Sequence, residues 1–264
     1  MTITLLRVSG PATVQDLGRP GFMHMGVPRG GALVPELIAR ANAAARNAPS
    51  EAAIELHGSI SVRADCALTL GTDDGHAHEL ALGETFTLPP SPHVRYVAVR
   101  GGILVPQVLG GRGTLLTAKL GGHEGRALAR GDVLAIGNTT PVDTAMPPPP
   151  STTAMVRVLP GPDLAHFTSG LSGLTRTAWH VGARHDRAGV LLSGSHVHRS
   201  DHGPLASAPM VRGAIQVPPS GEPIVLGPDH PTTGGYPVIA VIVTADLGAF
   251  FARPTHAQVE LTEA

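Results

Sequence analysis

The sequence contains very few cysteine, lysine and aromatic residues. Cys66 is the only cysteine among 264 residues, which excludes an internal disulfide. Lys119 is the only lysine, so no other position offers a Schiff base or a biotin or lipoyl attachment, and the chain does not encode a carrier domain. Aromatic residues make up 3% of the chain, so the core is expected to consist of Val, Leu, Ile and Ala. Cys66 lies in an apolar strand pattern and is expected to be buried and inert.

Strong net charge and long apolar runs are missing too. The formal net charge is −1 and no polybasic run occurs, which argues against a nucleic-acid partner and against binding to an anionic membrane. No apolar run reaches the ~18 residues of a membrane span. The N-terminal residues lack the charged start and apolar stretch of a signal peptide. We therefore expect a cytoplasmic protein that has neither a nucleic-acid nor a membrane partner.

Glycine and proline, in contrast, are abundant. The 33 glycines and 25 prolines indicate many sharp turns between short strands, and hence a mainly β fold of the barrel or sandwich type with few helices. One helix is expected over 32–47, with Pro35 near its start and Asn47 near its end. Strands are expected within residues 2–8, 62–71, 94–106, 124–137, 155–163, 175–194, 213–227 and 236–252. A hairpin is expected over 78–89, with its turn at Leu82 to Glu84.

A proline-rich stretch divides the chain. "NTTPVDTAMPPPPSTTA", residues 138–154, has four consecutive prolines between small polar residues, which is typical of an extended linker or a surface crossing. We therefore expect an N-terminal domain over 1–140 and a C-terminal domain over 155–264. The segments "QDLGRPGFMHMG" and "RHDRAGVLLSG" resemble each other loosely, which favours a duplication.

Two glycine-rich segments of the first half concentrate charge at tight bends. Residues 13–31 contain Gln15, Asp16, Arg19 and His24. They predict either a long turn in which the aspartate caps a neighbour and pairs with the arginine, or a rigid loop that presents the arginine to an anion. Residues 109–128 carry Arg112, Glu124 and Arg126 among six glycines. Their backbone N–H groups and guanidinium groups suit a phosphate or carboxylate, although a plain turn explains the pattern as well, and no Walker A motif is present.

Two similar segments occur in the second half. "ARHDRAGV", residues 183–190, places His185, Asp186 and Arg187 in a row, a pattern that a solvated charged turn also explains. "GPDHPTTGGYP", residues 227–237, offers the hydroxyls of Thr232 and Thr233. Its Gly234 and Gly235 allow positive φ, and together these groups suit an oxyanion or a phosphoryl oxygen.

Other classes of site are not supported by the sequence. Neighbouring histidines occur in "SHVH" and "HAHEL", but no carboxylate third ligand lies near them in the sequence, so no metal site is expected in this chain. No G-x-S-x-G motif is present either, which argues against a serine nucleophile.

The four segments, in this order, resemble the allophanate hydrolase subunit 2 family, also called the biotin-dependent carboxyltransferase family, which includes the C subunit of bacterial 5-oxoprolinase. The matching words are "TVQDLGRPG" with "MGVPRGGA", "GGILVPQVLGGRGT" with "GGHEGRAL", "HDRAG", and "GAIQVPPSGEPIVL" with "TTGGYPVIAVIVTADL". They cover nearly the whole chain, and four ordered matches are far more specific than one.

The resemblance implies a fold, a reaction and partners. It implies two tandem cyclophilin-like β-barrel domains, a B subunit that resembles allophanate hydrolase subunit 1, and a separate A subunit. The implied reaction converts the lactam 5-oxoproline, ATP and water to glutamate, ADP and phosphate. ATP with Mg²⁺ would bind at the subunit interface, and this chain would carry no covalently attached biotin.

We assign roles within that reaction as hypotheses. The guanidinium groups of Arg19, Arg112 and Arg187 would clamp anions, while Asp16 and Asp186 would orient them or hold Mg²⁺. The catalytic candidates are Asp16, Arg19, Asp186 and Arg187. The candidates for binding substrate are Gln15, His24, Arg112, Glu124, Arg126, Gln216, Thr232, Thr233, Gly234, Gly235 and Tyr236.

The sequence also departs from the family pattern at expected pocket positions. Relatives read "LGSRST" where this chain reads "LGGRGT", and "SDRMGYRL" where it reads "HDRAGVLL". The residues that differ include Val34, Gly113, His185, Val190, His230 and Pro231. Two other functions therefore stay open: the carboxyltransferase part of a biotin-dependent urea carboxylase-like system, and a partner-binding module without catalysis.

Overall fold

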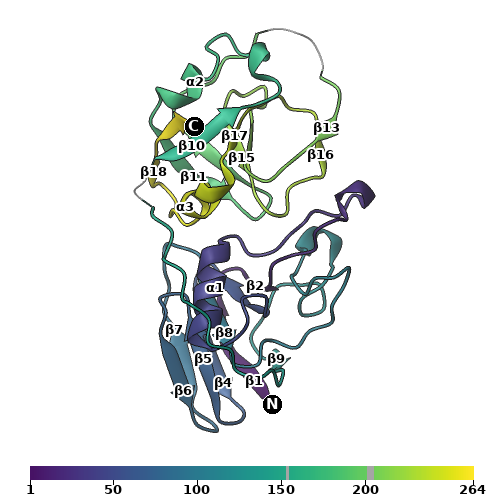
Figure 1. Ribbon diagram of the computed structural model, residues 1–264, viewed down its shortest axis with the longest axis vertical. Coiled ribbons are helices and arrows are strands. Elements are labelled where there is room, and N and C mark those ends of the chain that lie inside the picture. The colour runs from purple at the N-terminus through teal and green to yellow at the C-terminus, as the bar shows by residue number, and fades with distance from the viewer. Residues whose placement is uncertain (153–154, 201–204) are drawn as a thin grey trace. The chain divides into compact units, whose positions relative to one another are not determined.

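The computed structural model describes residues 1–152, 155–200 and 205–264 (Figure 1). Two units follow from its contacts: unit 1 comprises Met1–Pro20 and Gly30–Pro150, and unit 2 comprises Gly21–Arg29 and Ser151–Ala264. Strands dominate both units, and the described residues form three short α-helices, which confirms the mainly β expectation. None of the helices in the described ranges is long and apolar enough to cross a membrane.

Unit 1 contains two antiparallel sheets. One has the strand order β7-β4-β1-β9 and the other the order β2-β3-β8-β5-β6. The bounds are β1 Thr2–Ser9, β2 Ala12–Gln15, β3 Ala53–Leu56, β4 Ser59–Ala64, β5 Leu68–Thr72, β6 Ala77–Leu80, β7 Thr85–Leu88, β8 Arg95–Val99 and β9 Val133–Ala135. Side chains from both sheets form one buried cluster of Ile, Leu, Val and Ala, as the scarcity of aromatic residues predicts.

The helix of unit 1 lies within the predicted range. Helix α1 spans Pro35–Ala44, with Pro35 in its first turn, where a missing N–H costs no hydrogen bond. It is shorter than the expected 32–47, and it is the longest helix of the described residues. Leu37, Ile38 and Ala41 are buried on the side of α1 that contacts β3, β5 and β8.

The hairpin expected over 78–89 is wrong. Strand β6 pairs with β5, and β7 pairs with β4, so the two strands belong to different sheets. The hairpin turn lies instead between β5 and β6, at residues 73–76. The chain bends between β4 and β5 at residues 65–67, and between β6 and β7 at residues 81–84. The first bend divides the strand that was expected over 62–71. Cys66 lies at this bend and is half-buried, not fully buried as expected.

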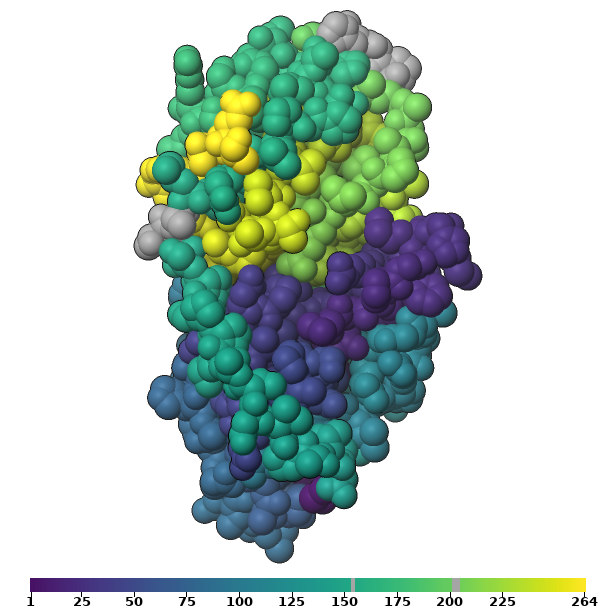
Figure 2. All heavy atoms as spheres, in the orientation of Figure 1, coloured from purple at the N-terminus to yellow at the C-terminus, as the bar shows by residue number. Residues whose placement is uncertain are grey.

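The proline-rich segment lies on the surface of unit 1. Residues 138–152 form no helix or strand, and Figure 2 shows this segment in teal running over unit 1. Arg46 Nε donates to Asp143 Oδ1 at 2.8 Å, and Arg40 Nη1 donates to the Pro147 carbonyl at 2.6 Å. Both arginines belong to α1 or follow it directly, so the segment is held along the helix. The last two residues of the expected linker, 153–154, lie outside the described residues.

Unit 2 is built around an eight-stranded sheet with the order β18-β11-β12-β15-β14-β17-β10-β19. The two outermost strands are separated in the chain by Glu260 alone, so the sheet curls into a nearly closed barrel. Figure 1 accordingly shows the C-terminus beside β10, with which β19 pairs in parallel. The bounds are β10 Val156–Pro160, β11 Trp179–His185, β12 Gly189–Ser193, β14 Ala214–Gln216, β15 Ile224–Leu226, β17 Val238–Ile242, β18 Gln258–Val259 and β19 Leu261–Glu263.

Short elements complete the two units. Helix α2 spans Ser172–Thr175, helix α3 spans Leu247–Phe251, and β13 Ala208–Pro209 pairs with β16 Thr233–Gly234. Four 3-10 helices are η1 Met23–Met25, η2 Leu116–Ala118, η3 Leu164–His166 and η4 Thr244–Asp246. The single tryptophan, Trp179, is completely buried in unit 2, where its indole N–H donates to the Leu174 carbonyl at 2.9 Å.

Candidate functional site

In unit 1, the carboxylate of Asp16 joins two of the glycine-rich segments. Oδ1 accepts hydrogen bonds from the backbone N–H groups of Gly18 at 2.8 Å and Gly113 at 3.1 Å, and Oδ2 accepts one from Arg112 at 2.5 Å. Asp16 is 6% exposed. The aspartate therefore caps backbone N–H groups, as the turn interpretation predicts, and it also links two loops that lie far apart in the sequence.

Arg19 reinforces the same junction from inside the protein. Its side chain is completely buried; Nη2 donates to the Gly113 carbonyl, and Nε donates to the Val108 carbonyl at 3.4 Å. The glycines allow this close approach, because a Cβ atom at Gly121 would lie 2.7 Å from Arg19 Nη2. We call the contact between residues 15–19 and 108–122 the two-loop junction.

Gln15 completes the junction and leaves one acceptor unsatisfied. Nε2 donates to Thr13 Oγ1 and to the Thr114 carbonyl, each at 3.0 Å. Within the described residues, the buried Oε1 atom has no hydrogen-bond partner. A Cβ atom at Gly113 would lie 2.7 Å from Oε1, so Gly113 gives the amide its space.

Arg112 is the residue that the two-loop junction presents. Its backbone N–H is fixed by Asp16, while its side chain is half-buried. The described residues provide no hydrogen bond or ion pair to its guanidinium group. The junction thus holds a cation whose charge no carboxylate of the described chain neutralises.

Arg126 and Glu124 lie in a separate ion-pair network. Arg126 donates to both oxygens of Asp132 at 2.8 Å and to Glu124 Oε2 at 3.2 Å. The hydrogen bond to Asp132 raises the pKa of Arg126, and the same bond lowers the pKa of Asp132 below its usual range. The fork of Arg126 is therefore occupied within the protein. His24, on η1, is exposed and belongs to unit 2.

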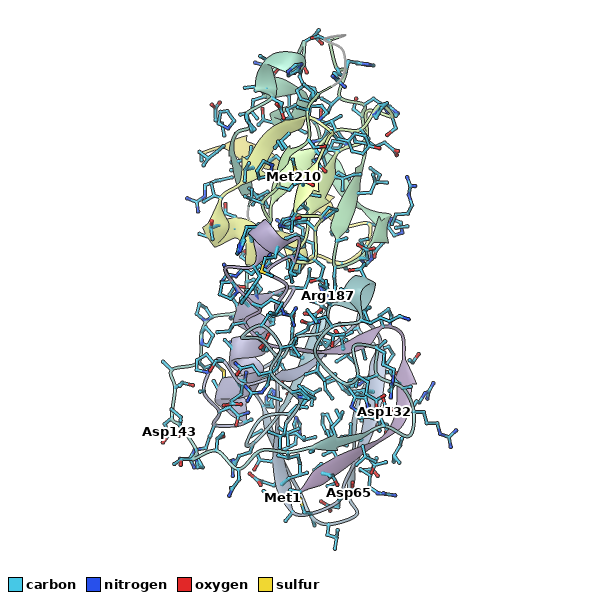
Figure 3. All side chains as sticks on the ribbon, turned by 90° about the vertical axis from the view of Figure 1, so that its right-hand side faces the viewer. Met1, Asp65, Asp132, Asp143, Arg187 and Met210 are labelled. Atoms are coloured by element: carbon cyan, nitrogen blue, oxygen red, sulfur yellow. The ribbon has the colours of Figure 1, made fainter. Side chains whose placement is uncertain are left out.

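In unit 2, the turn between β11 and β12 is closed by Asp186. Its Oδ1 accepts hydrogen bonds from the N–H groups of Ala188 at 2.8 Å and Gly189 at 3.0 Å. Arg187, labelled in Figure 3, points to Asp229, with Nε to Oδ2 at 2.8 Å and Nη2 to Oδ1 at 3.0 Å. The two side chains are 12% and 7% exposed, so this is a buried bidentate pair that ties the turn to the segment 227–237.

The segments 183–190 and 227–237 both border a cavity of about 740 Å³ in unit 2. Its floor is the outer face of three neighbouring strands, because Gly189 pairs with Leu226, Leu191 with Ile224, and Ile224 with Gln216. The alternate residues of these strands, among them Val190, Leu192, Ile215 and Val225, are buried on the opposite face. The polar groups at the cavity come from Arg184, His185, Asp186, Gln216, Ser220, Glu222 and Tyr236.

The segment 231–237 contributes to the cavity through Pro231 and Tyr236. Gln216 Nε2 donates to the Tyr236 carbonyl at 3.1 Å and lies 3.2 Å from the sulfur of Met210, which Figure 3 places among the strands of unit 2. Gly234 and Gly235 allow positive φ, but neither residue adopts it. Gly234 is small for another reason: a Cβ atom there would lie 2.7 Å from Gln216 Nε2.

The two threonines of this segment differ in exposure. Thr232 is half-buried and its carbonyl accepts the N–H of Met210 at 3.0 Å, whereas Thr233 is exposed on β16. Of the positions that depart from the family pattern, His185 and Pro231 border the cavity. The others are buried: Val34, Gly113, Val190 and His230.

The structure thus gathers the predicted residues into two groups. Gln15, Asp16, Arg19 and Arg112 meet at the two-loop junction of unit 1, while Asp186, Gln216 and Tyr236 meet at the cavity of unit 2. The convergence of the two groups on one ligand stays a prediction. In the described ranges, no group of three or more His, Cys, Asp or Glu side chains is placed to hold a metal ion.

Sequence reasoning missed three charged residues of unit 2. Asp229 is the partner of Arg187, and Arg184 and Glu222 face each other at the cavity with 3.7 Å between Arg184 Nη2 and Glu222 Oε2. The only local signal for Asp229 was its place between two prolines in "GPDHP". Arg184 adjoins the predicted triplet, and Glu222 stands in "PPSGEP", which looks like an ordinary turn.

Comparison with known proteins relates most of the chain to one family. The family model described as carboxyltransferase domain, subdomain A and B, matches residues 25–263. The C subunit of 5-oxoprolinase from Escherichia coli strain K12 is 33% identical over 265 residues, covering 93% of this chain and 86% of that protein. The crystal structure of TTHA0988 aligns with a TM-score of 0.86 and 28% identity over 99% of this chain, which spans 55% of that chain. The crystal structure of the Kluyveromyces lactis urea carboxylase aligns with a TM-score of 0.88 and 21% identity. The alignment covers 99% of this chain and 27% of that protein, so the two share the fold.

Proposed function

Because the chain belongs to the family of carboxyltransferase domains with subdomains A and B, we propose that it is the C subunit of an ATP-dependent 5-oxoprolinase. The reaction consumes 5-oxoproline, ATP and water and yields glutamate, ADP and phosphate. The chain acts in the cytoplasm together with an A subunit and a B subunit. The 33% identity to the E. coli C subunit across most of both chains supports this proposal. We further propose that units 1 and 2 are both cyclophilin-like barrels.

The observation that carries the proposal is the presentation of Arg112. Two buried charged residues, Asp16 and Arg19, hold the loop around it, and the described residues leave its guanidinium group without a carboxylate. Burying charged groups costs free energy, so a frame built on two of them indicates that the position of this loop matters. In this proposal Asp16 and Arg19 are positioning residues, and Arg112 contacts the ligand.

A guanidinium group at a fixed position suits the chemistry of lactam opening. An amide carbonyl is a poor electrophile, and its oxygen gains negative charge when a nucleophile attacks or when it takes up a phosphoryl group. A preorganised arginine stabilises that charge by two parallel hydrogen bonds without moving. Arg112 would supply this interaction to a carboxylate, a phosphoryl group or the developing oxyanion.

Within the part of the chain that the structure describes, the residues do not fit a complete nucleotide site of their own. The buried carboxylate of Asp16 already accepts three backbone N–H groups, which disfavours a further role as a ligand of Mg²⁺. The cavity of unit 2 carries Asp186 and Glu222 against one arginine, which disfavours a triphosphate. We therefore propose that ATP with Mg²⁺ binds at the interface with a partner subunit.

The family description favours a second candidate, the carboxyltransferase part of a biotin-dependent system. In that case the acceptor would be urea or another small amide, and biotin would arrive on a carrier domain of another chain. The two candidates differ in what they need: lactam opening requires the A and B subunits, whereas carboxyl transfer requires a biotin carboxylase.

Reconstitution tests the proposed function directly. Purified A, B and C chains are mixed and ADP release is measured with 5-oxoproline, and each chain is omitted in turn. We expect ADP release coupled to glutamate formation that falls to background without this chain. Full turnover by A and B alone would contradict the proposal. Turnover of urea with a biotin carboxylase, in place of 5-oxoproline, would favour the second candidate.

A further inference from the structure

We propose that the cavity of unit 2 binds a free α-amino acid, with the ligand carboxylate against Arg184 and its ammonium group against the neighbouring Glu222. The inference does not depend on the proposed 5-oxoprolinase reaction. It rests on the charges at the cavity, their present contacts, and the apolar floor beneath them.

The positive charge at the cavity is available to a ligand. Arg184 Nη2 lies 3.7 Å from Glu222 Oε2, which is longer than a hydrogen bond, and the side chain of Arg184 is 79% exposed. Within the described residues, this guanidinium group donates no hydrogen bond. An incoming carboxylate can therefore form the two parallel N–H···O bonds that Glu222 does not form.

The cavity also carries two carboxylates, and one of them lies next to the arginine. Asp186 uses Oδ1 to accept the N–H groups of Ala188 and Gly189, which fixes the orientation of the carboxylate. The described residues provide no partner for its Oδ2. Glu222 borders the same cavity with a side chain that is 35% exposed. Glu222 lies next to Arg184, so it can accept from the ammonium group of a ligand whose carboxylate meets that arginine, and Asp186 adds a second negative charge at the cavity.

The balance of charge selects a zwitterion over a simple acid. A ligand that carries only carboxylates would be attracted by Arg184 but repelled by Asp186 and Glu222. A ligand that carries only an amine would leave the arginine without a new partner. An α-amino acid brings one charge of each sign, on groups attached to the same carbon atom, to a cavity that offers both signs.

The floor and the volume indicate room for an aliphatic body. Leu191, Ile224 and Leu226 lie side by side on the floor, and Gly189 lets Ile224 pack closely against it, since a Cβ atom there would lie 3.0 Å from Ile224 Cγ2. The volume of about 740 Å³ lies within the range of about 300–1,000 Å³ that is typical of small-molecule sites. A branched aliphatic side chain would cover the floor while the two charged groups reach the rim.

The cavity would also distinguish the substrate of the proposed reaction from its product. The nitrogen of a lactam is a neutral amide, whereas opening of the ring creates an ammonium group. If the 5-oxoprolinase assignment holds, the cavity binds the glutamate that is formed in preference to 5-oxoproline.

Titration calorimetry of the purified chain with a matched set of ligands tests the inference. L-Leucine carries both charges, 4-methylpentanoate carries the carboxylate alone, and 3-methylbutylamine carries the amine alone. We expect the Kd of L-leucine to be at least tenfold lower than that of either partial ligand. L-Glutamate and 5-oxoproline form a second pair, in which glutamate should bind at least tenfold more tightly.

Substitutions assign the binding to the cavity. Arg184→Met and Glu222→Gln should each raise the Kd of L-leucine at least tenfold, while Arg184→Lys should restore part of the affinity. Arg176→Met and Glu263→Gln remove equivalent charges from exposed positions of unit 2 outside the cavity, and should leave the Kd unchanged. The fluorescence of Trp179 reports whether each variant is folded.

Three results would overturn the inference. One is equal affinity for L-leucine and 4-methylpentanoate. Another is the absence of L-leucine binding at concentrations up to about 10 mM, a Kd that corresponds to about −2.7 kcal/mol. The third is equal loss of affinity in the control variants. Turnover by the reconstituted complex is measured on the same proteins, so failure of amino-acid binding with normal turnover would refute this inference and leave the proposed function standing.

Discussion

Replacement of Asp16 by alanine should release the loop that carries Arg112. Three backbone N–H groups, those of Gly18, Arg112 and Gly113, donate to a carboxylate that is 6% exposed. Hydrogen bonds to charged groups contribute about 1.5–3 kcal/mol each, and a buried donor left without a partner costs a similar amount. Since water can enter and the three bonds are not additive, we expect a local loss of about 3 kcal/mol.

Hydrogen exchange measured by mass spectrometry can detect this loss in peptides that cover residues 108–122. A loss of about 3 kcal/mol corresponds to protection that falls on the order of 100-fold. Asp186→Ala is the matched control, because Asp186 accepts two backbone N–H groups but is exposed. For Asp186→Ala we expect the local stability around Ala188 and Gly189 to fall by at most about 1 kcal/mol. Unchanged protection of 108–122 in Asp16→Ala would refute the view that this carboxylate holds the two-loop junction.

Three further variants test other parts of the structure. Asp132→Asn should lower the free energy of unfolding by about 1 kcal/mol at pH 7. Arg126 lowers the pKa of Asp132 in the folded protein, so this difference from wild type, measured by urea unfolding, should persist down to the unfolded pKa of about 3.9. It should vanish as the pH falls through the folded pKa. Gly113→Ala should lower the free energy of unfolding by about 1–3 kcal/mol, since its Cβ atom would lie 2.7 Å from Gln15 Oε1. Gly235→Ala is the control: the nearest neighbour of its Cβ atom would be 3.9 Å away, so it should be neutral in the same measurement. Arg187→Leu should cost about 3–5 kcal/mol by removing the bidentate partner of the buried Asp229, as followed by Trp179 fluorescence in urea. The double variant Arg187→Leu/Asp229→Leu should be more stable than Arg187→Leu, and additive losses would contradict the pairing.

Local rules predicted the parts of the fold that depend on local sequence. Pro35 marked the start of α1 because its ring suits the first turn of a helix. The aliphatic composition predicted the core, since the buried cluster of unit 1 contains only Ile, Leu, Val and Ala. Alternation located most strands but not their partners, which is why β6 and β7 were assigned to one hairpin although they pair with β5 and β4.

The candidate site shows the same division between local and long-range information. Asp16 and Arg112 were identified by their glycine-rich surroundings, but the hydrogen bond between them spans 96 positions in the sequence. Arg187 was identified as a candidate anion clamp, whereas its carboxylate partner Asp229 is 42 positions away and belongs to a different motif. Such partners depend on which strands become neighbours, and a single sequence does not specify that.

The most direct test of the account is the kcat for ADP release by the reconstituted complex when the chain carries Arg112→Met. We expect a loss of about 100-fold, which is typical of removing one donor that stabilises developing charge, and partial recovery in Arg112→Lys. Arg130→Met, which removes an exposed arginine outside the two-loop junction, should retain wild-type turnover. Turnover of Arg112→Met within twofold of wild type would contradict the claim that the junction exists to present this guanidinium group.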